Sequence, residues 1–337
     1  MSLSATLIAR IHEASFKMST PLTDSSAAAA SSPSRIQVLD LIKAVAMLGV
    51  IGLHSFHGPA YYCMSFAIPV FFMMTGYLQI TRPRPVSYCA IKIYKIARYL
   101  LLVGICYTIA KYVISGEVAP IDIVKNIYLG VFQHNNLGLV WFLAALALVY
   151  VAMPLLSCLY GRHRRFFIAL TIGLLVWQAV SFAREIVAGV PLESHTPQFL
   201  RLWHWFGYAC LGALLREARL QHLLRHLWLL LIPAIVATAM LGLRYSWLAE
   251  CFYGSLPVVI YSTAIFVLFL RVPIKPSRLI AAIPPLFVPV YTIHLYVVDA
   301  LRPFFCGFPL FVATTIVSVG LAWLVTRPPL LRRLLTI

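Results

Sequence analysis

The amino-acid sequence predicts an all-α integral membrane protein with about ten transmembrane helices. Of its 337 residues, 61% are hydrophobic and 11% are charged, whereas soluble domains are about 45–50% apolar and about 25% charged. The apolar residues gather into runs long enough to cross a hydrocarbon layer about 30 Å thick. Most of the 27 Lys and Arg residues fall between these runs, on one side of the implied topology. Such a charge bias orients membrane proteins and places that side in the cytoplasm.

Ten apolar runs have the length of a transmembrane helix. They lie at about 40–58, 61–80, 94–115, 138–158, 166–188, 199–216, 226–243, 252–270, 279–300 and 304–326. The segment 120–133 is shorter and more polar, so we expect an interfacial or re-entrant helix there. With ten crossings and a cytoplasmic N-terminus, both termini are predicted to be cytoplasmic.

Residues 1–34 form a separate part of the chain. They include the stretch MSTPLTDSSAAAASSPS, whose composition is typical of disordered segments, so we expect a cytoplasmic tail there. Translation from either Met1 or Met18 is compatible with the sequence. Residues 35–337 are predicted to form one membrane-embedded domain.

The composition also excludes some classes of function. An excess of 27 basic over 10 acidic residues is found in many nucleic-acid-binding proteins. Here the basic residues are spread over short loops, so we expect no nucleic-acid partner. The seven cysteines have no paired spacing and the histidines lie in no ligand pattern, so we expect neither a disulfide framework nor a bound metal.

The first predicted span, DLIKAVAMLGVIGLHSF, carries a lysine near one end and a histidine near the other. At about 100° per residue, an eleven-residue step returns to within roughly 20° of the same helix face and advances by about 16 Å. Lys43 and His54 therefore face the same way and are predicted to be two ends of one site. Polar groups inside a membrane are costly and often functional, but His54 is equally compatible with an interhelical hydrogen bond. Lys43 is also compatible with an ion pair to Asp40 or with a side chain that reaches the interface.

The stretches RIQVLDLIKAVAMLGVIGLHSF and IPVFFMMTGYLQI resemble the first two helices of the membrane-bound acyltransferase 3 family. In that family ten residues separate a basic residue and a histidine in the first helix, as in Lys43 and His54. The segments KIYKIARYL, LVWFLAALALVYVAMPLL, FGYACLGALL and VPVYTIHLYVV continue the resemblance, which covers nearly all of residues 35–330. The sequence departs from the family in Thr75, where serine is common, and in Lys95, where many members have arginine.

The resemblance implies an O-acyltransferase of the cell's inner membrane. The donor implied is a cytoplasmic acyl-CoA, usually acetyl-CoA. The acceptor implied is a hydroxyl group of an envelope or exported carbohydrate or glycolipid.

Acyl transfer from a thioester to a sugar hydroxyl requires a base near the acceptor and groups that hold the donor's phosphates. We assign the base to His54, because the imidazole pKa lies near physiological pH. We assign donor binding to Lys95, Arg98 and Lys43, with Lys43 also close to the chemistry and Asp40 orienting it. The positive-inside rule by itself also accounts for Lys95 and Arg98.

A second group of residues is expected to bind substrate or support the site: Thr75, Tyr77, Trp141, Tyr291 and His294. The glycine between Thr75 and Tyr77 allows close approach of another backbone. Tyr77 and Trp141 are also compatible with the aromatic residues that commonly lie at membrane interfaces. Tyr291 and His294 share a helix face near a proline that interrupts the helix.

Two other functions remain compatible with the sequence. A transporter of an anionic solute would use Lys43 and His54 as pathway groups. Such transporters usually have carboxylates at mid-membrane. Here the acidic residues lie mainly at span ends and in loops, which disfavours a transporter. A non-catalytic assembly protein of a polysaccharide complex would tolerate loss of His54.

Overall fold

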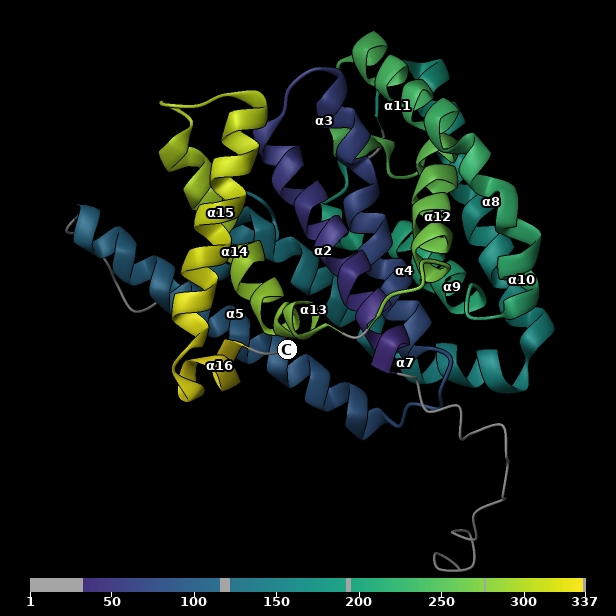
Figure 1. The fold of residues 1–337 in the computed structure, drawn as a ribbon, viewed down its shortest axis with the longest axis horizontal. Coiled ribbons are helices and arrows are strands. Elements are labelled where there is room, and N and C mark those ends of the chain that lie inside the picture. The colour runs from purple at the N-terminus through teal and green to yellow at the C-terminus, as the bar shows by residue number, and fades with distance from the viewer. Residues whose placement is uncertain (1–32, 116–121, 192–194, 276, 336–337) are drawn as a thin grey trace, which may run out of the picture.

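The computed structural model describes residues 33–115, 122–191, 195–275 and 277–335, and within these residues it contains helices and no strands. The predicted tail, residues 1–34, lies almost entirely outside them. The helices in Figure 1 are α2 (Pro33–Ser55), α3 (Pro59–Cys63), α4 (Ala67–Gln79), α5 (Val86–Ser115), α6 (Asp122–Val131), α7 (Trp141–Arg162), α8 (Arg164–Ala188), α9 (Leu202–Leu214), α10 (Ala218–Leu223), α11 (Leu231–Tyr245), α12 (Leu256–Leu270), α13 (Arg278–Ala282), α14 (Phe287–Leu301), α15 (Gly307–Thr326) and α16 (Pro329–Leu335). Short 3₁₀ segments are η1 (Met64–Phe66), η2 (Gly138–Val140), η4 (Gln198–Leu200), η5 (Leu224–Leu230), η6 (Ala249–Phe252) and η7 (Pro284–Leu286).

Seven helical segments in the described ranges are long and apolar enough to cross a membrane. They are Gln37–Ser55, Pro59–Gln79, Gly138–Arg162, Arg164–Ala188, Ala218–Tyr245, Arg278–Leu301 and Gly307–Thr326. Each coincides with one of the predicted runs. The shorter apolar helix α12 coincides with an eighth. The all-α, multi-pass membrane character is therefore confirmed.

Two of the ten predicted spans take a different form, so the expected number is not confirmed. The run at 94–115 belongs to α5, which is not among the seven candidate spans and crosses the lower end of the bundle obliquely in Figure 1. The run at 199–216 contains α9, whose 13 residues reach only about 20 Å at roughly 1.5 Å per residue. Helix α6 has 10 residues, too few to cross, as expected for segment 120–133.

The shortness of α9 reflects its position in the interior, where it packs closely against α4. A Cβ atom built on Gly76 would lie 1.7 Å from the Ala209 carbonyl oxygen, and one built on Gly212 would lie 1.8 Å from the Met73 carbonyl oxygen. Both glycines are therefore required for the two backbones to touch, as the sequence predicts for the glycine after Thr75. Small residues at helix contacts serve the same purpose in many membrane proteins.

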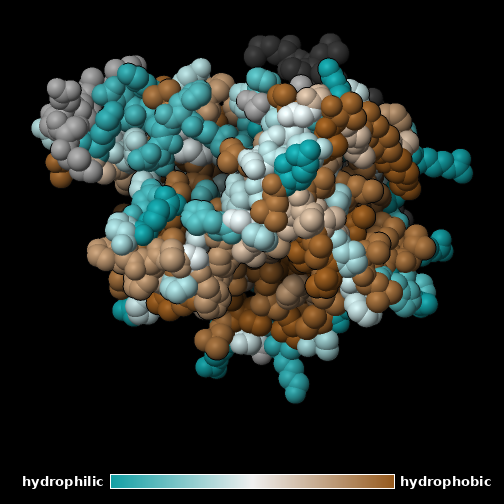
Figure 2. All heavy atoms as spheres, turned by 90° about the horizontal axis from the view of Figure 1, so that it is seen from above, coloured by the Kyte–Doolittle hydropathy of each residue, from teal (hydrophilic) through white to brown (hydrophobic). Residues whose placement is uncertain are grey.

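The outer helices expose apolar side chains. On α8, Ile172, Val176 and Val180 follow one another at four-residue intervals and are more than half exposed. Figure 2 shows broad apolar areas of this kind on the surface. Such a surface is suited to lipid, because large exposed apolar patches are unfavourable in water.

Candidate functional site

One face of α2 lines two cavities. Lys43 and Met47 line the first cavity, of about 260 Å³, and Val50 and His54 line the second, of about 390 Å³. The steps of four, three and four residues keep all four side chains on a single face of the helix. The predicted common direction of Lys43 and His54 is therefore confirmed. We refer to these two spaces as the lysine cavity and the histidine cavity.

The lysine cavity combines cationic and hydroxyl groups with apolar walls. The Lys43 ammonium lies 3.2 Å from Asp40 Oδ1 and 5.7 Å from the centre of the Phe287 ring. Asp40 is buried and fixes the lysine, as expected from their three-residue spacing. Thr75 also lines the cavity, and its hydroxyl donates to the Phe71 carbonyl at 3.0 Å.

A second lysine, Lys92 of α5, lines this cavity as well. Burial lowers the pKa of Lys92, and the positive charges of Lys95, Arg84 and Lys43 lower it further. Lys92 is therefore close enough to three other cationic side chains to be repelled by them. A bound polyanion would relieve that repulsion.

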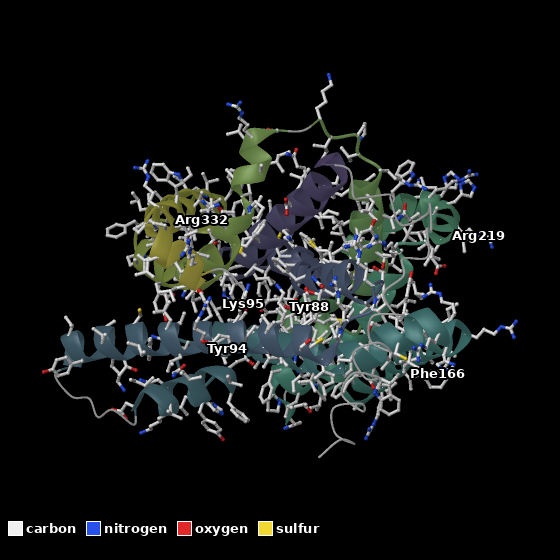
Figure 3. The ribbon with its side chains drawn as sticks, turned by 90° about the horizontal axis from the view of Figure 1, so that it is seen from below. Tyr88, Tyr94, Lys95, Phe166, Arg219 and Arg332 are labelled. Carbon is white, nitrogen blue, oxygen red and sulfur yellow. The ribbon has the colours of Figure 1, made fainter. Side chains whose placement is uncertain are left out.

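The other cationic residues chosen from the sequence do not line the cavity. Arg98 donates through Nη2 to the Arg333 carbonyl at 2.9 Å and so ties α5 to α16. Lys95 lies on the stretch of α5 beneath the bundle (Figure 3) and acts on the cavity through its charge at Lys92. Tyr77 is buried on another face of α4, beside Arg216. No direct contact of these three residues with the lysine cavity is seen.

The histidine cavity has a more polar lining. Besides His54 it is lined by Trp141, Gln198 and Glu250. Trp141 is 5% exposed and its ring centre lies 5.4 Å from that of Trp205. Trp141 is therefore buried in a cavity wall and is not exposed on the surface of the protein.

Tyr291 lies in the walls of both cavities. Its hydroxyl donates to the Leu139 carbonyl at 2.8 Å, and its ring centre lies 5.4 Å from that of Phe142. Lys43 and His54, which the sequence predicts to be two ends of one site, thus line two separate cavities that share one residue. In the part of the chain that the structure describes, no continuous passage joins Lys43 to His54.

His294 lies against His54. Their ring centres are 5.3 Å apart, and His294 Nδ1 donates to the Val290 carbonyl at 3.1 Å. The His294 side chain is fully buried, and its Nε2 has no hydrogen-bond partner in the part of the chain that the structure describes. The second histidine of the sequence prediction is therefore placed beside the first by the fold.

Sequence reasoning did not select Lys92, Gln198 or Glu250. Lys92 precedes Lys95 by three residues and shares its helix face, so spacing was a usable signal for it. Gln198 and Glu250 come from short 3₁₀ segments 52 residues apart in number, and no local pattern links them. Among the described residues, no cluster of three or more His, Cys, Asp or Glu side chains is arranged to hold a metal ion.

Comparison with known proteins gives one result. No curated protein and no solved structure matches the chain. The model of the acyltransferase 3 family, described as an acyltransferase domain, matches residues 36–327 and so includes both cavities and all the residues that line them. With its apolar spanning helices, the chain therefore belongs to the acyltransferase 3 family of membrane proteins.

Proposed function

We propose that this protein is an O-acyltransferase that moves an acyl group, most simply acetyl, from cytoplasmic acyl-CoA to a hydroxyl of an envelope or exported glycan. The observation that carries the proposal is the placement of Lys43 and His54 on one face of α2, each lining its own cavity beside Tyr291. In this proposal the lysine cavity receives the donor, and the histidine cavity receives the acceptor.

The cationic character of the lysine cavity supports donor binding at that end. CoA carries phosphate groups, which are bound well by ammonium and guanidinium side chains. Lys43 and Lys92 offer direct contacts. Lys95 and Arg98 would attract the phosphates from the adjoining surface of α5, which the positive-inside rule places in the cytoplasm.

The reaction proposed at the other end uses His54 as the base. The acceptor oxygen forms a bond to the thioester carbonyl carbon while His54 accepts the hydroxyl proton. The carbon–sulfur bond then breaks, and the CoA thiolate takes the proton from His54. The products are the acylated glycan and free CoA, and His54 is returned to its starting state. His294, whose ring lies against His54, would act as a positioning residue.

Tyr291 determines how the two substrates meet. The thioester must pass from the lysine cavity toward His54, and Tyr291 is the residue that lines both cavities. We propose that the Tyr291 ring moves when the pantetheine arm binds, which requires breaking one hydrogen bond to the Leu139 carbonyl. A net value of about 0.5–1.5 kcal/mol for such a bond makes the movement accessible.

The test uses purified full-length protein in lipid nanodiscs. Acetyl-CoA is expected to raise the unfolding temperature, and cells that lack the gene are expected to lose an acetyl mass increment from an envelope polysaccharide. Absence of both effects would contradict the proposal. A transporter would be favoured if a small anion stabilises the protein and acetyl-CoA does not. An assembly protein would be favoured if the glycan of a His54→Ala strain has the same acylation as that of wild type.

A further inference from the structure

The polar wall of the histidine cavity contains a buried hydrogen-bonding group without a partner. Gln198 is 2% exposed, and its Oε1 accepts no hydrogen bond from any residue that the structure describes. An unsatisfied buried acceptor normally costs free energy and so calls for an explanation. Gln198 lines the cavity beside His54, so its side chain is part of the wall that a ligand in that cavity would meet.

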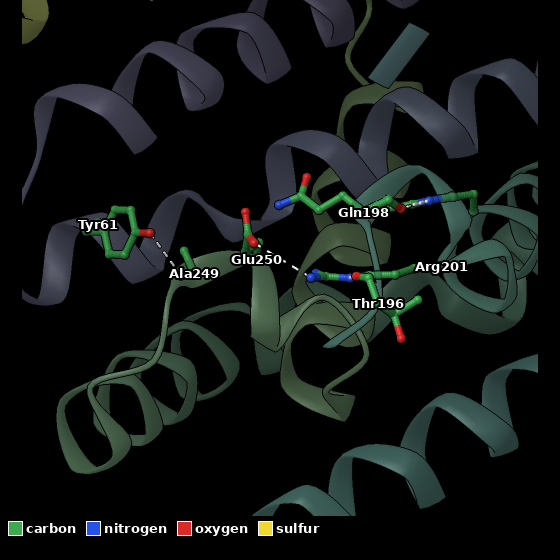
Figure 4. A network of polar contacts seen from close by, with 7 residues as sticks. Tyr61, Thr196, Gln198, Arg201, Ala249 and Glu250 are labelled. Atoms are coloured by element: carbon green, nitrogen blue, oxygen red, sulfur yellow. Dashed lines mark hydrogen bonds and ion pairs between the residues drawn. The ribbon is translucent and has the colours of Figure 1, made fainter. Parts of the chain in front are cut away.

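Hydrogen bonds hold the backbone of Gln198 and so fix the point of the wall from which its side chain extends. Its carbonyl accepts hydrogen bonds from Trp205 Nε1 at 2.8 Å and from the Arg201 amide at 3.1 Å. Figure 4 shows the side chain extending away from these contacts toward Glu250 and Tyr61. A fixed backbone reduces the conformational freedom that is lost when a ligand binds to the side chain.

Glu250 supplies a second acceptor in the same wall. Its carboxylate lies 3.7 Å from Arg201 Nη2, and Arg201 is also bound to the Thr196 carbonyl at 3.0 Å. Tyr61 accepts a hydrogen bond from the Ala249 amide and so fixes the turn that carries Glu250 (Figure 4). Arg201 is buried behind the carboxylate and does not line the cavity.

The charges around the histidine cavity therefore favour one class of ligand. Its lining contains one carboxylate and several amides, but no Lys or Arg among the described residues. Hydroxyl groups donate well to such acceptors. Arg201 pairs with Glu250 from behind the wall, so on the cavity side a ligand carboxylate or phosphate would meet the Glu250 carboxylate with no lining cation beside it, and like charges repel.

We propose that Gln198 and Glu250 bind non-reacting hydroxyl groups of the acceptor and make the site selective for an uncharged polyhydroxyl compound over one that carries an acidic group beside the reacting hydroxyl. The proposal rests on the proposed function, because His54 is taken as the base in the same cavity. Beyond that function, Gln198 and Glu250 are assigned as specificity-determining residues, and the acceptor is assigned as uncharged.

The experiment uses the full-length protein in nanodiscs, acetyl-CoA, and a panel of matched probes. The probes are the methyl glycosides of glucose, galactose and mannose and the methyl glycosides of the corresponding uronic acids. Release of CoA thiol and the mass of the product report acyl transfer. Wild-type protein is expected to use at least one neutral glycoside with kcat/KM on the order of tenfold or more above its uronic acid counterpart.

Four variants, one of them a control, separate recognition from a structural effect. Gln198→Leu is expected to raise the acceptor KM on the order of tenfold, as for a lost hydrogen bond to a buried group, with the KM for acetyl-CoA unchanged. Glu250→Gln is expected to reduce the discrimination against uronic acids. Gln221→Leu, the same exchange at a residue outside the cavity, serves as the control. If Gln198→Leu unfolds, Gln198→Glu retains the shape and is expected to weaken use of the neutral glycosides.

The outcomes distinguish the two proposals. If acetyl-CoA neither binds nor is consumed by wild-type protein, the proposed function is wrong and the selectivity falls with it. If acetyl-CoA binds and is consumed, three results would contradict the proposed selectivity and leave the proposed function intact. They are equal use of neutral and acidic probes, use of no probe, and an unchanged acceptor KM in a folded Gln198 variant.

Discussion

Lys43 and His54 lie on the same face of α2 but line two different cavities. A step of eleven residues along the helix places them about 16 Å apart. The Lys43 ammonium is thus at the end where we propose that the donor binds. The His54 imidazole is at the end where we propose that the acceptor binds. This separation allows one substrate to be held by its charge at a distance from the chemistry, so changes at the two ends are expected to have different kinetic effects.

Replacement of His54 by alanine is expected to lower kcat by about 10²–10⁴-fold, the usual contribution of a general base. Binding of acetyl-CoA should be retained, because the lysine cavity does not include His54. The measurements are CoA thiol release with acceptor present and thermal stabilisation by acetyl-CoA. His57→Ala is the matched control, since His57 is exposed and lines neither cavity. Equal losses in both variants would argue against His54 as the base.

Replacement of Lys92 by glutamine is expected to raise the KM for acetyl-CoA with little change in kcat. The reason is that Lys92 lines the lysine cavity and would contact phosphate in the bound donor in ground and transition states alike. Arg219→Gln is the control, because Arg219 is exposed (Figure 3) and lies outside that cavity. A fall in kcat with an unchanged KM would contradict this role.

The pH dependence of donor binding is expected to report Lys92. Its pKa is lowered from the ordinary value of 10.5 by burial and by the positive charges of Lys95, Arg84 and Lys43. As pH rises through the lowered value, Lys92 loses its proton, so the KM for acetyl-CoA should rise at a lower pH than for an ordinary lysine. Lys92→Arg stays charged throughout this range. This variant should therefore move the alkaline rise to higher pH, and an identical profile would exclude Lys92 as its origin.

The sequence was informative wherever one helix determines the geometry. The spacing of Lys43 and His54, the ion pair of Lys43 with Asp40, and the position of each long apolar helix follow from helix periodicity and hydropathy. The pairing of His54 with His294 depends on how α2 and α14 pack, and one sequence does not reveal that packing.

The interior helix α9 shows why the number of spans was harder to predict. Its residues are as apolar as those of a spanning helix, and hydropathy does not distinguish burial in protein from burial in lipid. Gly212 and Gly76 decide the difference by allowing α9 to touch α4. Gln198 and Glu250 illustrate the same limit for the site, because only the fold brings their short segments together.

The close contact of α4 with α9 predicts a large effect of one added methyl group. Gly212→Ala is expected to lower stability by about 1–3 kcal/mol, since the new Cβ would overlap the Met73 backbone and the helices would have to separate. Gly320→Ala is the matched control, because no atom lies within 4 Å of its Cβ position. That variant should be neutral or slightly stabilising, by up to roughly 1 kcal/mol. Thermal unfolding in nanodiscs measures both, and equal stabilities would contradict the close contact.

Removal of the Tyr291 side chain is expected to join the two cavities, because Tyr291 lines both of them. Tyr291→Ala should therefore admit water to the thioester and raise hydrolysis of acetyl-CoA in the absence of acceptor, while transfer to the acceptor falls. Tyr291→Phe retains the ring and loses only the bond to the Leu139 carbonyl, so its hydrolysis should remain close to that of wild type. The ratio of acetate to acylated product distinguishes the variants. Hydrolysis that is unchanged in Tyr291→Ala would show that another residue closes the passage between donor and base.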